Sequence, residues 1–333
     1  MGRLKRIAVI GCGGTISSVS DDPLDVVDYP EHGRKLDVTE VLDHVPAVSR
    51  IAECAPLPFR AVGSASIGPT DWLRLAARIE EACGGSENFD GVVVLHGTAT
   101  LEETAWFLHL VLKTAKPVVL VGAQRPLSAV SADGPMNLVA AVRAAAEPGC
   151  AGLGVVVLLN DELHSAREVT KTSTLRLQTF QSPDFGMLGQ VDADRVALYR
   201  RPMRPHTTGT AFHLAKLGAL PRVDIVPAYA GADAVAVEAF RAAGARGLVS
   251  AGLAPGLTPP KQRAAIEAAA AEGVVVVQST RCLGGRGVRR RALREAGVVA
   301  ADNLNPQKAR ILLMLVLTQS DTPDAVQAAF DRY

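Results

Sequence analysis

Short apolar runs alternate with longer amphipathic stretches along most of this chain. The apolar runs are rich in β-branched residues, as buried strands are, and they fall at residues 7–10, 92–95, 118–121, 155–159, 223–226, 248–250 and 274–278. Patterns typical of helices lie between them, at residues 71–83, 101–112 and 260–271. This alternation predicts an α/β fold whose parallel sheets are joined by crossover helices.

Two of the expected helices begin with capping signals. Thr100 is followed three residues later by Glu103, the spacing of a capping box, and Thr258 stands before two prolines as a candidate N-cap. Both mark junctions between a strand and a helix. Because ligands of open α/β sheets bind at the carboxyl ends of strands, we expect the functional site in the loops that follow residues 10, 95 and 159.

An irregular stretch that contains several prolines interrupts the pattern between residues 201 and 222. We therefore predict an N-terminal catalytic α/β domain over residues 1–200, a linker over residues 201–222 and a smaller C-terminal α/β domain over residues 223–333. The sequence contains no internal repeat, low-complexity tract or heptad pattern, which excludes solenoid and fibrous classes.

Composition and charge narrow the class of partner. The 333 residues are 48% hydrophobic, enough for a substantial buried core. Lys and Arg number 35 against 34 Asp and Glu, so a net charge of +1 gives no field that would attract nucleic acid or an anionic membrane. No apolar run reaches the roughly 20 residues of a membrane span. Glycines after the first strand would interrupt the core of an export signal, so we expect a cytoplasmic protein.

Five cysteines are scattered along the chain, at positions 12, 54, 83, 150 and 282. Their number is odd, and they form neither a CxxC pair nor a Cys/His spacing that would suit zinc. We therefore expect reduced thiols and no metal site.

The first strand ends in the segment Gly11-Cys12-Gly13-Gly14-Thr15, whose glycines permit a tight turn that holds a hydroxyl at the strand end. On this motif alone, Thr15 could be a nucleophile, part of a phosphate-binding turn or part of a plain structural turn. The phosphate interpretation lacks the lysine of a P-loop and the spaced glycines of a dinucleotide site.

Two further strand ends carry polar residues. Thr98 and Thr100 follow the second strand, where a threonine also serves to cap a helix or to satisfy loop amides. Lys171 lies in a polar stretch after another buried strand. Such a lysine is usually a solvated charge, but partial burial lowers its pKa and lets it take a proton from a hydroxyl or from water. A weak threonine nucleophile would be activated in that way.

Five segments together resemble the bacterial L-asparaginase/glutaminase family, whose members are amidohydrolases with a threonine nucleophile. They are GGTI, HGTxTLEETAWFL, KPVVLVGAQRPLSAVSADGPMNL, LNDELHSAREVTKT and DNLNPQKARILLMLVLTQ, and they follow the order of the family. The similarity covers nearly the whole chain. It implies a larger N-terminal and a smaller C-terminal α/β domain, no cofactor, and a homotetramer, a dimer of dimers, whose sites lie between paired subunits.

The resemblance also assigns roles to particular residues. Thr15 would attack the amide carbon to form an acyl-enzyme, and Tyr29 would close over it from a mobile loop at residues 17–34. Thr98 and Lys171 would handle proton transfer and the attacking water. Each of these residues lies on a loop after an expected strand or on a segment able to move.

The sequence departs from the family where the substrate's α-ammonium is held. The family motif HGTDT is HGTAT here, so Ala99 replaces an aspartate. Ala99 and Gly97 both belong to the expected substrate site. Leu257 replaces an asparagine of the neighbouring subunit's turn and has no side-chain hydrogen-bond acceptor. The serine that contacts the α-carboxylate aligns with an alanine at position 65, where Ser64 and Ser66 would substitute as substrate-binding residues.

The missing carboxylate should weaken binding of a substrate with a free ammonium. Truncating one partner of a buried charge pair typically costs about 2 to 5 kcal/mol, so a free ammonium should bind roughly 30- to several-thousand-fold worse. Glu102, Asp133 or a group from the partner subunit could replace the carboxylate. The arginines within residues 286–294, where the family supplies an acid, could meet anionic substrate groups or form only a solvated loop.

We therefore expect an L-asparaginase-type amidohydrolase that hydrolyses L-asparagine or a related small amide to a carboxylate and ammonia. One alternative is an amidohydrolase for an amide that lacks a free α-ammonium, and another is a non-catalytic protein that binds small amides on the same fold. The amidase subunit of a tRNA-dependent amidotransferase shares these motifs, but we expect no extra N-terminal domain here, and the chain has no basic surplus.

Overall fold

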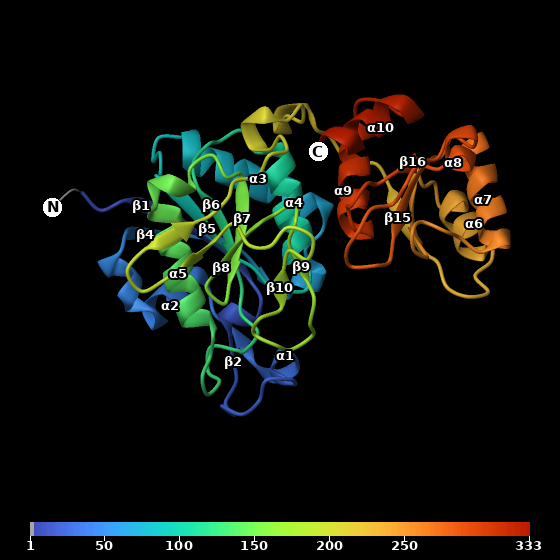
Figure 1. Cartoon of the computed structure of the whole chain (residues 1–333). Helices are drawn as coiled ribbons and strands as arrows, with labels where there is room; N and C mark the ends of the chain where they lie inside the picture. Colours follow the sequence, from blue (N-terminus) through green and yellow to red (C-terminus); the bar gives the residue numbers. More distant parts are fainter. Residues whose placement is uncertain (1–2) are drawn as a thin grey trace. The chain divides into compact units, whose positions relative to one another are not determined.

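The computed structural model describes residues 3–333, and the chain divides into two compact units, Met1–Leu214 and Ala215–Tyr333 (Figure 1). The division falls within residues 201–222, for which the sequence predicts a linker. The bounds of that linker stay a prediction. No helix among the described residues is long and apolar enough to cross a membrane.

An eight-stranded sheet forms the centre of the first unit, in the order β12-β11-β8-β7-β6-β5-β1-β4. Five neighbouring strands run parallel: β4 (Glu53–Val62), β1 (Arg6–Gly13), β5 (Gly91–Leu95), β6 (Val118–Val121) and β7 (Val155–Leu159). Antiparallel pairing adds β8 (Glu162–Ser165), β11 (Gly189–Val191) and β12 (Val196–Leu198). The predicted parallel α/β architecture is therefore confirmed, with an antiparallel extension at one edge.

Four helices connect the successive parallel strands: α2 (Val38–His44), α3 (Pro69–Gly84), α4 (Leu101–Val111) and α5 (Gly134–Ala146). Figure 1 shows α2 and α5 over one face of the sheet and α3 and α4 over the other. Alternate strand residues, such as Val9 and Val93, pack against Val41 of α2 and Ala141 of α5. The strands β1, β5, β6 and β7 are buried on both faces, which explains why they are apolar rather than alternating.

Short elements between the strands carry much of the functional site. The turn η1 (Thr15–Ser17) follows β1, and α1 (Tyr29–His32) lies between the antiparallel partners β2 (Ser18–Val19) and β3 (Arg34–Lys35). The turn η3 (Ser64–Ser66) follows β4, and the pair β9 (Thr170–Lys171) and β10 (Phe180–Gln181) follows β8. The other short turns are η2 (Pro46–Arg50), η4 (Pro148–Cys150), η5 (Thr207–Gly209) and η6 (Leu214–Lys216).

The second unit contains a four-stranded parallel sheet: β13 (Val223–Pro227), β14 (Gly247–Gly252), β15 (Val275–Thr280) and β16 (Val299–Ala300). Its helices are α6 (Val235–Ala242), α7 (Pro260–Ala271), α8 (Arg291–Glu295), α9 (Pro306–Val316) and α10 (Pro323–Arg332). Leu248 and Val276 of the sheet pack with Val237 of α6 and Ile266 of α7. The smaller C-terminal α/β domain is confirmed in this unit.

Both capping predictions are wrong in detail. Thr100 occupies the N-cap of α4, but its hydroxyl makes no capping bond and instead donates to the carbonyl oxygen of Ser64 at 2.8 Å. This hydroxyl therefore joins the loop after β5 to the loop after β4. The N-cap of α7 is Pro259 rather than Thr258, because the extended backbone continues one residue further.

Candidate active site

The carboxyl ends of four parallel strands meet at a hollow of about 310 Å³. Loops after β1, β4, β5 and β6 contribute Thr15, Ser64, Thr98 and Gln124 to its wall, and β9 contributes Lys171. Two of the three loops that were expected to carry the site, those after β1 and β5, do so. The third, after β7, continues through β8 and reaches the hollow at β9.

A tight turn brings the loops after β1 and β5 into contact. Gly14 has a φ of 87°, and a Cβ on it would lie 2.2 Å from the Cα of Gly97. Only glycine permits this backbone at this separation. The next residue, Thr15, has its Oγ1 2.6 Å from the Oη of Tyr29, and either hydroxyl can donate. The turn therefore fixes a threonine hydroxyl against a phenol at the end of β1.

The segment that carries Tyr29 is folded around one carboxylate. Asp25 accepts hydrogen bonds from the backbone N–H groups of Val27 and Asp28 and pairs with His32 at 3.2 Å. Desolvation works to raise the pKa of Asp25, but the hydrogen bonds from N–H groups outweigh it and hold that pKa below its ordinary value. An ionised Asp25 thus supports the turn before α1. The mobility expected of residues 17–34 stays a prediction.

Across the hollow, three polar side chains form a second cluster. The Nζ of Lys171 donates to the Oγ1 of Thr98 at 2.7 Å and to the Oε1 of Gln124 at 3.3 Å. Thr98 in turn donates to the same amide oxygen at 3.2 Å. The Thr98 hydroxyl therefore bonds the lysine and glutamine side chains rather than the loop amides that a purely structural threonine would satisfy.

The environment of Lys171 favours its neutral form. The side chain is half-buried, and this desolvation lowers its pKa, while the nearby charge of Glu102 works in the opposite direction. A Glu102 carboxylate oxygen also accepts the backbone N–H of Lys171 at 3.0 Å, which fixes the strand that carries the lysine. A neutral amine beside a hydroxyl can accept a proton from it or from a water molecule.

Gln124 has no assigned role in the sequence-based site, yet it bonds both Thr98 and Lys171. Asp133 holds its backbone, since the carboxylate accepts the N–H groups of Gln124 and Arg125, each at 2.9 Å, and the amide of Asn137 at 3.1 Å. In the sequence, Gln124 belongs only to the family-like segment 116–138, and Asp133 is considered only as a replacement for the missing carboxylate. Asp133 therefore fixes the backbone of the loop that carries Gln124.

Only one of the two serines expected to bind substrate lies in the hollow. Ser64 is buried and lines it, whereas Ser66 is exposed outside its wall. Gly97 and Ala99 line the hollow as expected, and Ala99 is exposed to it. A Cβ on Gly97 would come within 2.9 Å of the Ser64 side chain, so a larger residue there would displace the serine.

A buried histidine supports the loop behind Thr98. His96 is 0% exposed, its Nδ1 donates to the carbonyl oxygen of Gly97 at 2.8 Å, and its Nε2 accepts from Thr104 at 3.0 Å. The indole N–H of Trp72 extends this series of hydrogen bonds by donating to the Thr104 hydroxyl at 3.0 Å. Because a carbonyl oxygen only accepts, Nδ1 must carry a proton, and burial, which lowers the pKa of His96 to about 4, keeps the ring neutral so that Nε2 accepts.

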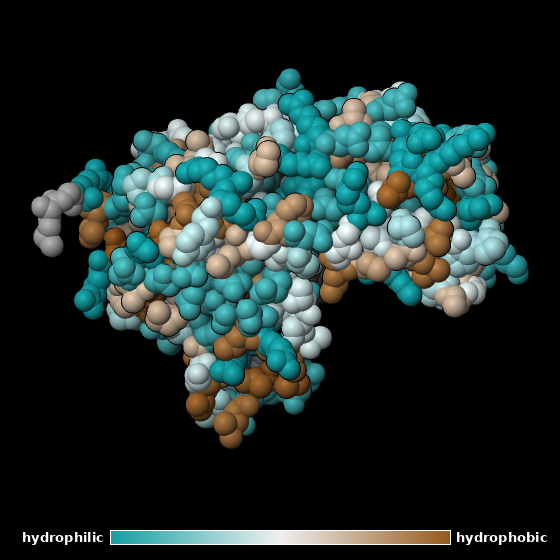
Figure 2. Space-filling view, in the orientation of Figure 1, coloured by the Kyte–Doolittle hydropathy of each residue, from teal (hydrophilic) through white to brown (hydrophobic). Residues whose placement is uncertain are grey.

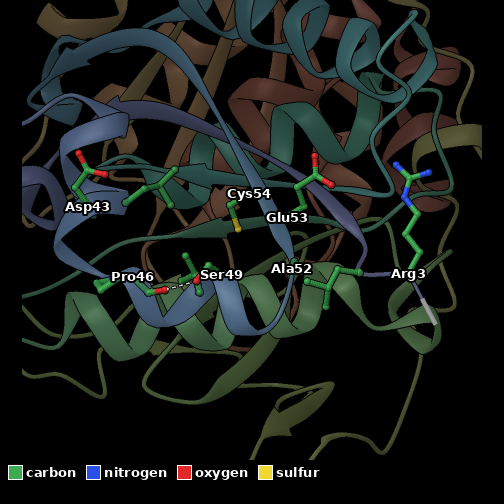
Figure 3. Close-up of a pocket in the computed structure, with 10 residues that line it drawn as sticks. Arg3, Asp43, Pro46, Ser49, Ala52, Glu53 and Cys54 are labelled. Atoms are coloured by element: carbon green, nitrogen blue, oxygen red, sulfur yellow. Dashed lines mark hydrogen bonds between the residues drawn. The ribbon is translucent and has the colours of Figure 1, made fainter. Parts of the chain in front are cut away.

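A larger hollow, of about 690 Å³, lies at the opposite end of the sheet (Figure 3). Arg3 precedes β1 there, and Ala52 and Glu53 lie at the start of β4, so this hollow is at the amino ends of the strands. Burial raises the pKa of the Cys54 thiol in its wall to about 11, which leaves that thiol protonated at neutral pH. Size alone therefore does not identify the functional hollow.

The basic residues 286–294 of the second unit are partly neutralised within that unit. Arg286 bonds Asp302, and Arg291 pairs with Glu295 at 2.7 Å. Arg294 donates to the carbonyl oxygen of Arg289 at 3.1 Å. These contacts account for several of the arginines as parts of a local surface network.

An α/β protein with threonine hydroxyls, a phenol and a partly desolvated lysine at its strand ends has the parts of an enzyme. Two family models match the chain: "Asparaginase, N-terminal" over residues 6–204 and "Glutaminase/Asparaginase C-terminal domain" over residues 222–330. The chain therefore belongs to the asparaginase/glutaminase family. It is a hydrolase that acts on amide C–N bonds.

Similar proteins span the full length of the chain. A probable periplasmic L-asparaginase from Haemophilus influenzae is 40% identical, covering 99% of this chain and 93% of that protein. L-asparaginase 2 from Escherichia coli is 39% identical, covering 99% and 94%. A crystal structure of a probable cytoplasmic L-asparaginase from Campylobacter jejuni has a TM-score of 0.94 at 38% identity and covers 99% of this chain and all of its own.

Proposed function

We propose that this chain is an L-asparaginase-type amidohydrolase that converts L-asparagine or a related small amide to a carboxylate and ammonia through an acyl-enzyme on Thr15. The observation that carries the proposal is a single hollow lined by a threonine hydroxyl 2.6 Å from a phenol and by a lysine amine 2.7 Å from a second threonine hydroxyl. Relatives named L-asparaginase and glutaminase-asparaginase support it.

In the first half of the reaction, the Oγ1 of Thr15 attacks the carbonyl carbon of the amide. The hydroxyl proton leaves through Tyr29, whose Oη is 2.6 Å away, and is delivered to the departing nitrogen. The C–N bond breaks, ammonia leaves, and the acyl group stays on Thr15 as an ester.

In the second half, water attacks the carbonyl carbon of the ester. Lys171 accepts a proton from this water through Thr98, because the lowered pKa of the lysine leaves more of the amine neutral. The ester C–O bond breaks, the proton returns to Thr15, and the carboxylic acid is released. The amide oxygen of Gln124 accepts hydrogen bonds from both Lys171 and Thr98 and so positions their side chains.

Ammonia release from a panel of amides tests the proposal, with Thr15→Ala as the decisive variant. We expect its kcat to fall at least about a thousandfold, as when other enzymes lose their covalent nucleophile. The matched control is Thr70→Ala, which removes an exposed threonine outside the hollow and should keep full activity. Binding of amides without turnover by the parent protein would instead support a non-catalytic binding protein.

We also propose a homotetramer, a dimer of dimers, that works in the cytoplasm without a cofactor. Light scattering after gel filtration tests the assembly, and a monomer with full activity would contradict it. The relatives differ in location, since the Campylobacter jejuni protein is described as cytoplasmic and the Haemophilus influenzae protein as periplasmic. Cell fractionation decides between the two, and dialysis against EDTA should leave the rate unchanged.

A further inference from the structure

The charges around the hollow are unbalanced. Among the described residues that line it there are two lysines, Lys35 and Lys171, and no aspartate or glutamate. A ligand ammonium in this hollow would therefore meet the charged amine of Lys35 and the partly desolvated amine of Lys171, and no carboxylate of the described chain. A ligand carboxylate would be attracted.

The two acids that accept hydrogen bonds from backbone N–H groups of the catalytic cluster are thereby already engaged within the chain. Glu102 accepts the backbone N–H of Lys171, and Asp133 accepts the N–H groups of Gln124 and Arg125. Neither acid lines the hollow. They stabilise the protein's own donors, so within this chain neither replaces the carboxylate that a substrate ammonium needs.

Lys35 is the available cation. It lies on β3, opposite Ser18 of β2, and its side chain is half-buried at the wall of the hollow. No hydrogen bond or ion pair joins its Nζ to any residue in the described range 3–333. Its short strand, paired with β2, holds this unpaired ammonium beside the segment that carries Tyr29.

Part of the remaining wall is apolar. Val26 and Val27 from the segment before α1 line the hollow, and so does Leu175 from the loop after β9. Val27 is 64% exposed and Leu175 65%, although both are hydrophobic. Figure 2 shows hydrophobic surface gathered over the part of the chain around β2 and α1. Such surface suits an uncharged, partly apolar substituent better than an ammonium.

We propose that the preferred substrate is an anionic amide without a free α-ammonium, whose carboxylate meets Lys35 and whose α-substituent is either absent or masked by an acyl group. The inference rests on the proposed amidohydrolase function and names the substrate class of the same site. A free ammonium placed in a hollow without a carboxylate should bind roughly 30- to several-thousand-fold worse.

Three amides that differ only at the α-position test the proposal: L-asparagine, succinamate and N-acetyl-L-asparagine. We expect at least one of the last two to exceed L-asparagine in kcat/KM by about 30-fold or more. Which of the two has the higher kcat/KM shows whether the site prefers an absent or a masked α-amine, since succinamate lacks the amine and the N-acetyl compound masks it. A kcat/KM for L-asparagine that equals or exceeds both overturns the proposal, and this is the result expected if a carboxylate from a second copy completes the site.

Two variants examine the residues that carry the argument. Ala99→Asp places a carboxylate at an exposed position of the hollow and should raise the ratio of L-asparagine to succinamate efficiency at least tenfold. Ala47→Asp, at an exposed alanine elsewhere, is its control. Lys35→Met should raise KM for succinamate about tenfold with little change in kcat, whereas Lys261→Met, at an exposed lysine of α7, should not.

The substrate proposal and the reaction proposal fail in different ways. If no amide gives ammonia, or if Thr15→Ala gives as much as the parent, then the amidohydrolase function falls and this inference falls with it. If ammonia release depends on Thr15 but L-asparagine is preferred and Ala99→Asp changes no ratio, only the substrate class is wrong.

Discussion

Acidification should weaken this protein through one buried imidazole. His96 is 0% exposed, with its Nδ1 donating to the Gly97 carbonyl and its Nε2 accepting from Thr104. A second proton would have to sit on Nε2, where Thr104 already receives a hydrogen bond from Trp72. Burial lowers the pKa of His96 from 6.5 to about 4, and the hydrogen bond to Gly97 offsets only part of that effect.

The magnitude follows from linkage between protonation and folding. The folded-state pKa is lower than the unfolded-state pKa, so the unfolded chain binds the extra proton first as pH falls below about 6.5. At pH 5 the ring is mostly protonated when unfolded and mostly neutral when folded. The free energy of unfolding should therefore be about 2 kcal/mol lower at pH 5 than at pH 7 through His96 alone. The free energy of unfolding stops falling through His96 only when the pH is below the folded-state pKa.

Chemical denaturation at pH 7 and pH 5, at one protein concentration, measures this dependence. His96→Asn keeps a donor near the Gly97 carbonyl but removes the titrating group. We expect the difference in unfolding free energy between the two pH values to shrink by about 2 kcal/mol in this variant. The same substitution at exposed His213 should leave the difference as in the parent. An unchanged difference in His96→Asn would refute the reasoning, whatever its absolute stability.

Three further substitutions test the geometry of the site. Tyr29→Phe should lower kcat about 100-fold or more, because it removes a proton carrier 2.6 Å from the nucleophile, and steady-state ammonia release measures it. Glu102→Gln should lower the pKa of Lys171 further and move the acidic limb of the kcat/KM profile to lower pH; an upward shift contradicts that charge assignment. Gly14→Ala should abolish activity, since its Cβ would collide with the opposite loop, while Gly231→Ala, at a φ of 84° with nothing within 4 Å, should remain active.

The central strands were predictable because helices cover them on both faces. Residues 118–121 and 155–159 match β6 and β7 as observed, and continuous apolar runs leave few alternatives for such segments. The strand β4 gave no such signal, since Pro56 and Pro58 lie within it. Proline has no N–H to donate and is tolerated in β4 because that strand is the edge of the sheet. Edge position is a property of the tertiary fold and is invisible in a local pattern.

The candidate site was predictable only in part for a related reason. Thr15, Thr98 and Lys171 line one hollow, and the strand pattern had placed the site in the loops that carry them, but it did not show which side chains of those loops meet. Gln124 accepts hydrogen bonds from Thr98 and Lys171. It reaches Thr98 because the loops that carry these two residues follow the neighbouring strands β5 and β6. Of the two serines expected to bind substrate, Ser64 lines the hollow and Ser66 does not, because the side of η3 that faces the hollow is set by its packing against Gly97, which a local pattern does not show.

Chemistry and specificity occupy positions with different structural constraints. The Gly14 turn lies against the opposite loop, and Thr98 is buried with its hydroxyl bonded to Lys171 and Gln124, so substitution there disturbs packing. Ala99 and Leu175, by contrast, are exposed to the hollow, and changes there alter the ligand's surroundings at little cost to folding. A chain of this family can therefore keep the machinery that cleaves an amide while losing the group that recognises an ammonium. Measuring kcat and KM separately for succinamate and L-asparagine distinguishes these two layers, because a specificity change alone leaves a competent catalyst for the right amide.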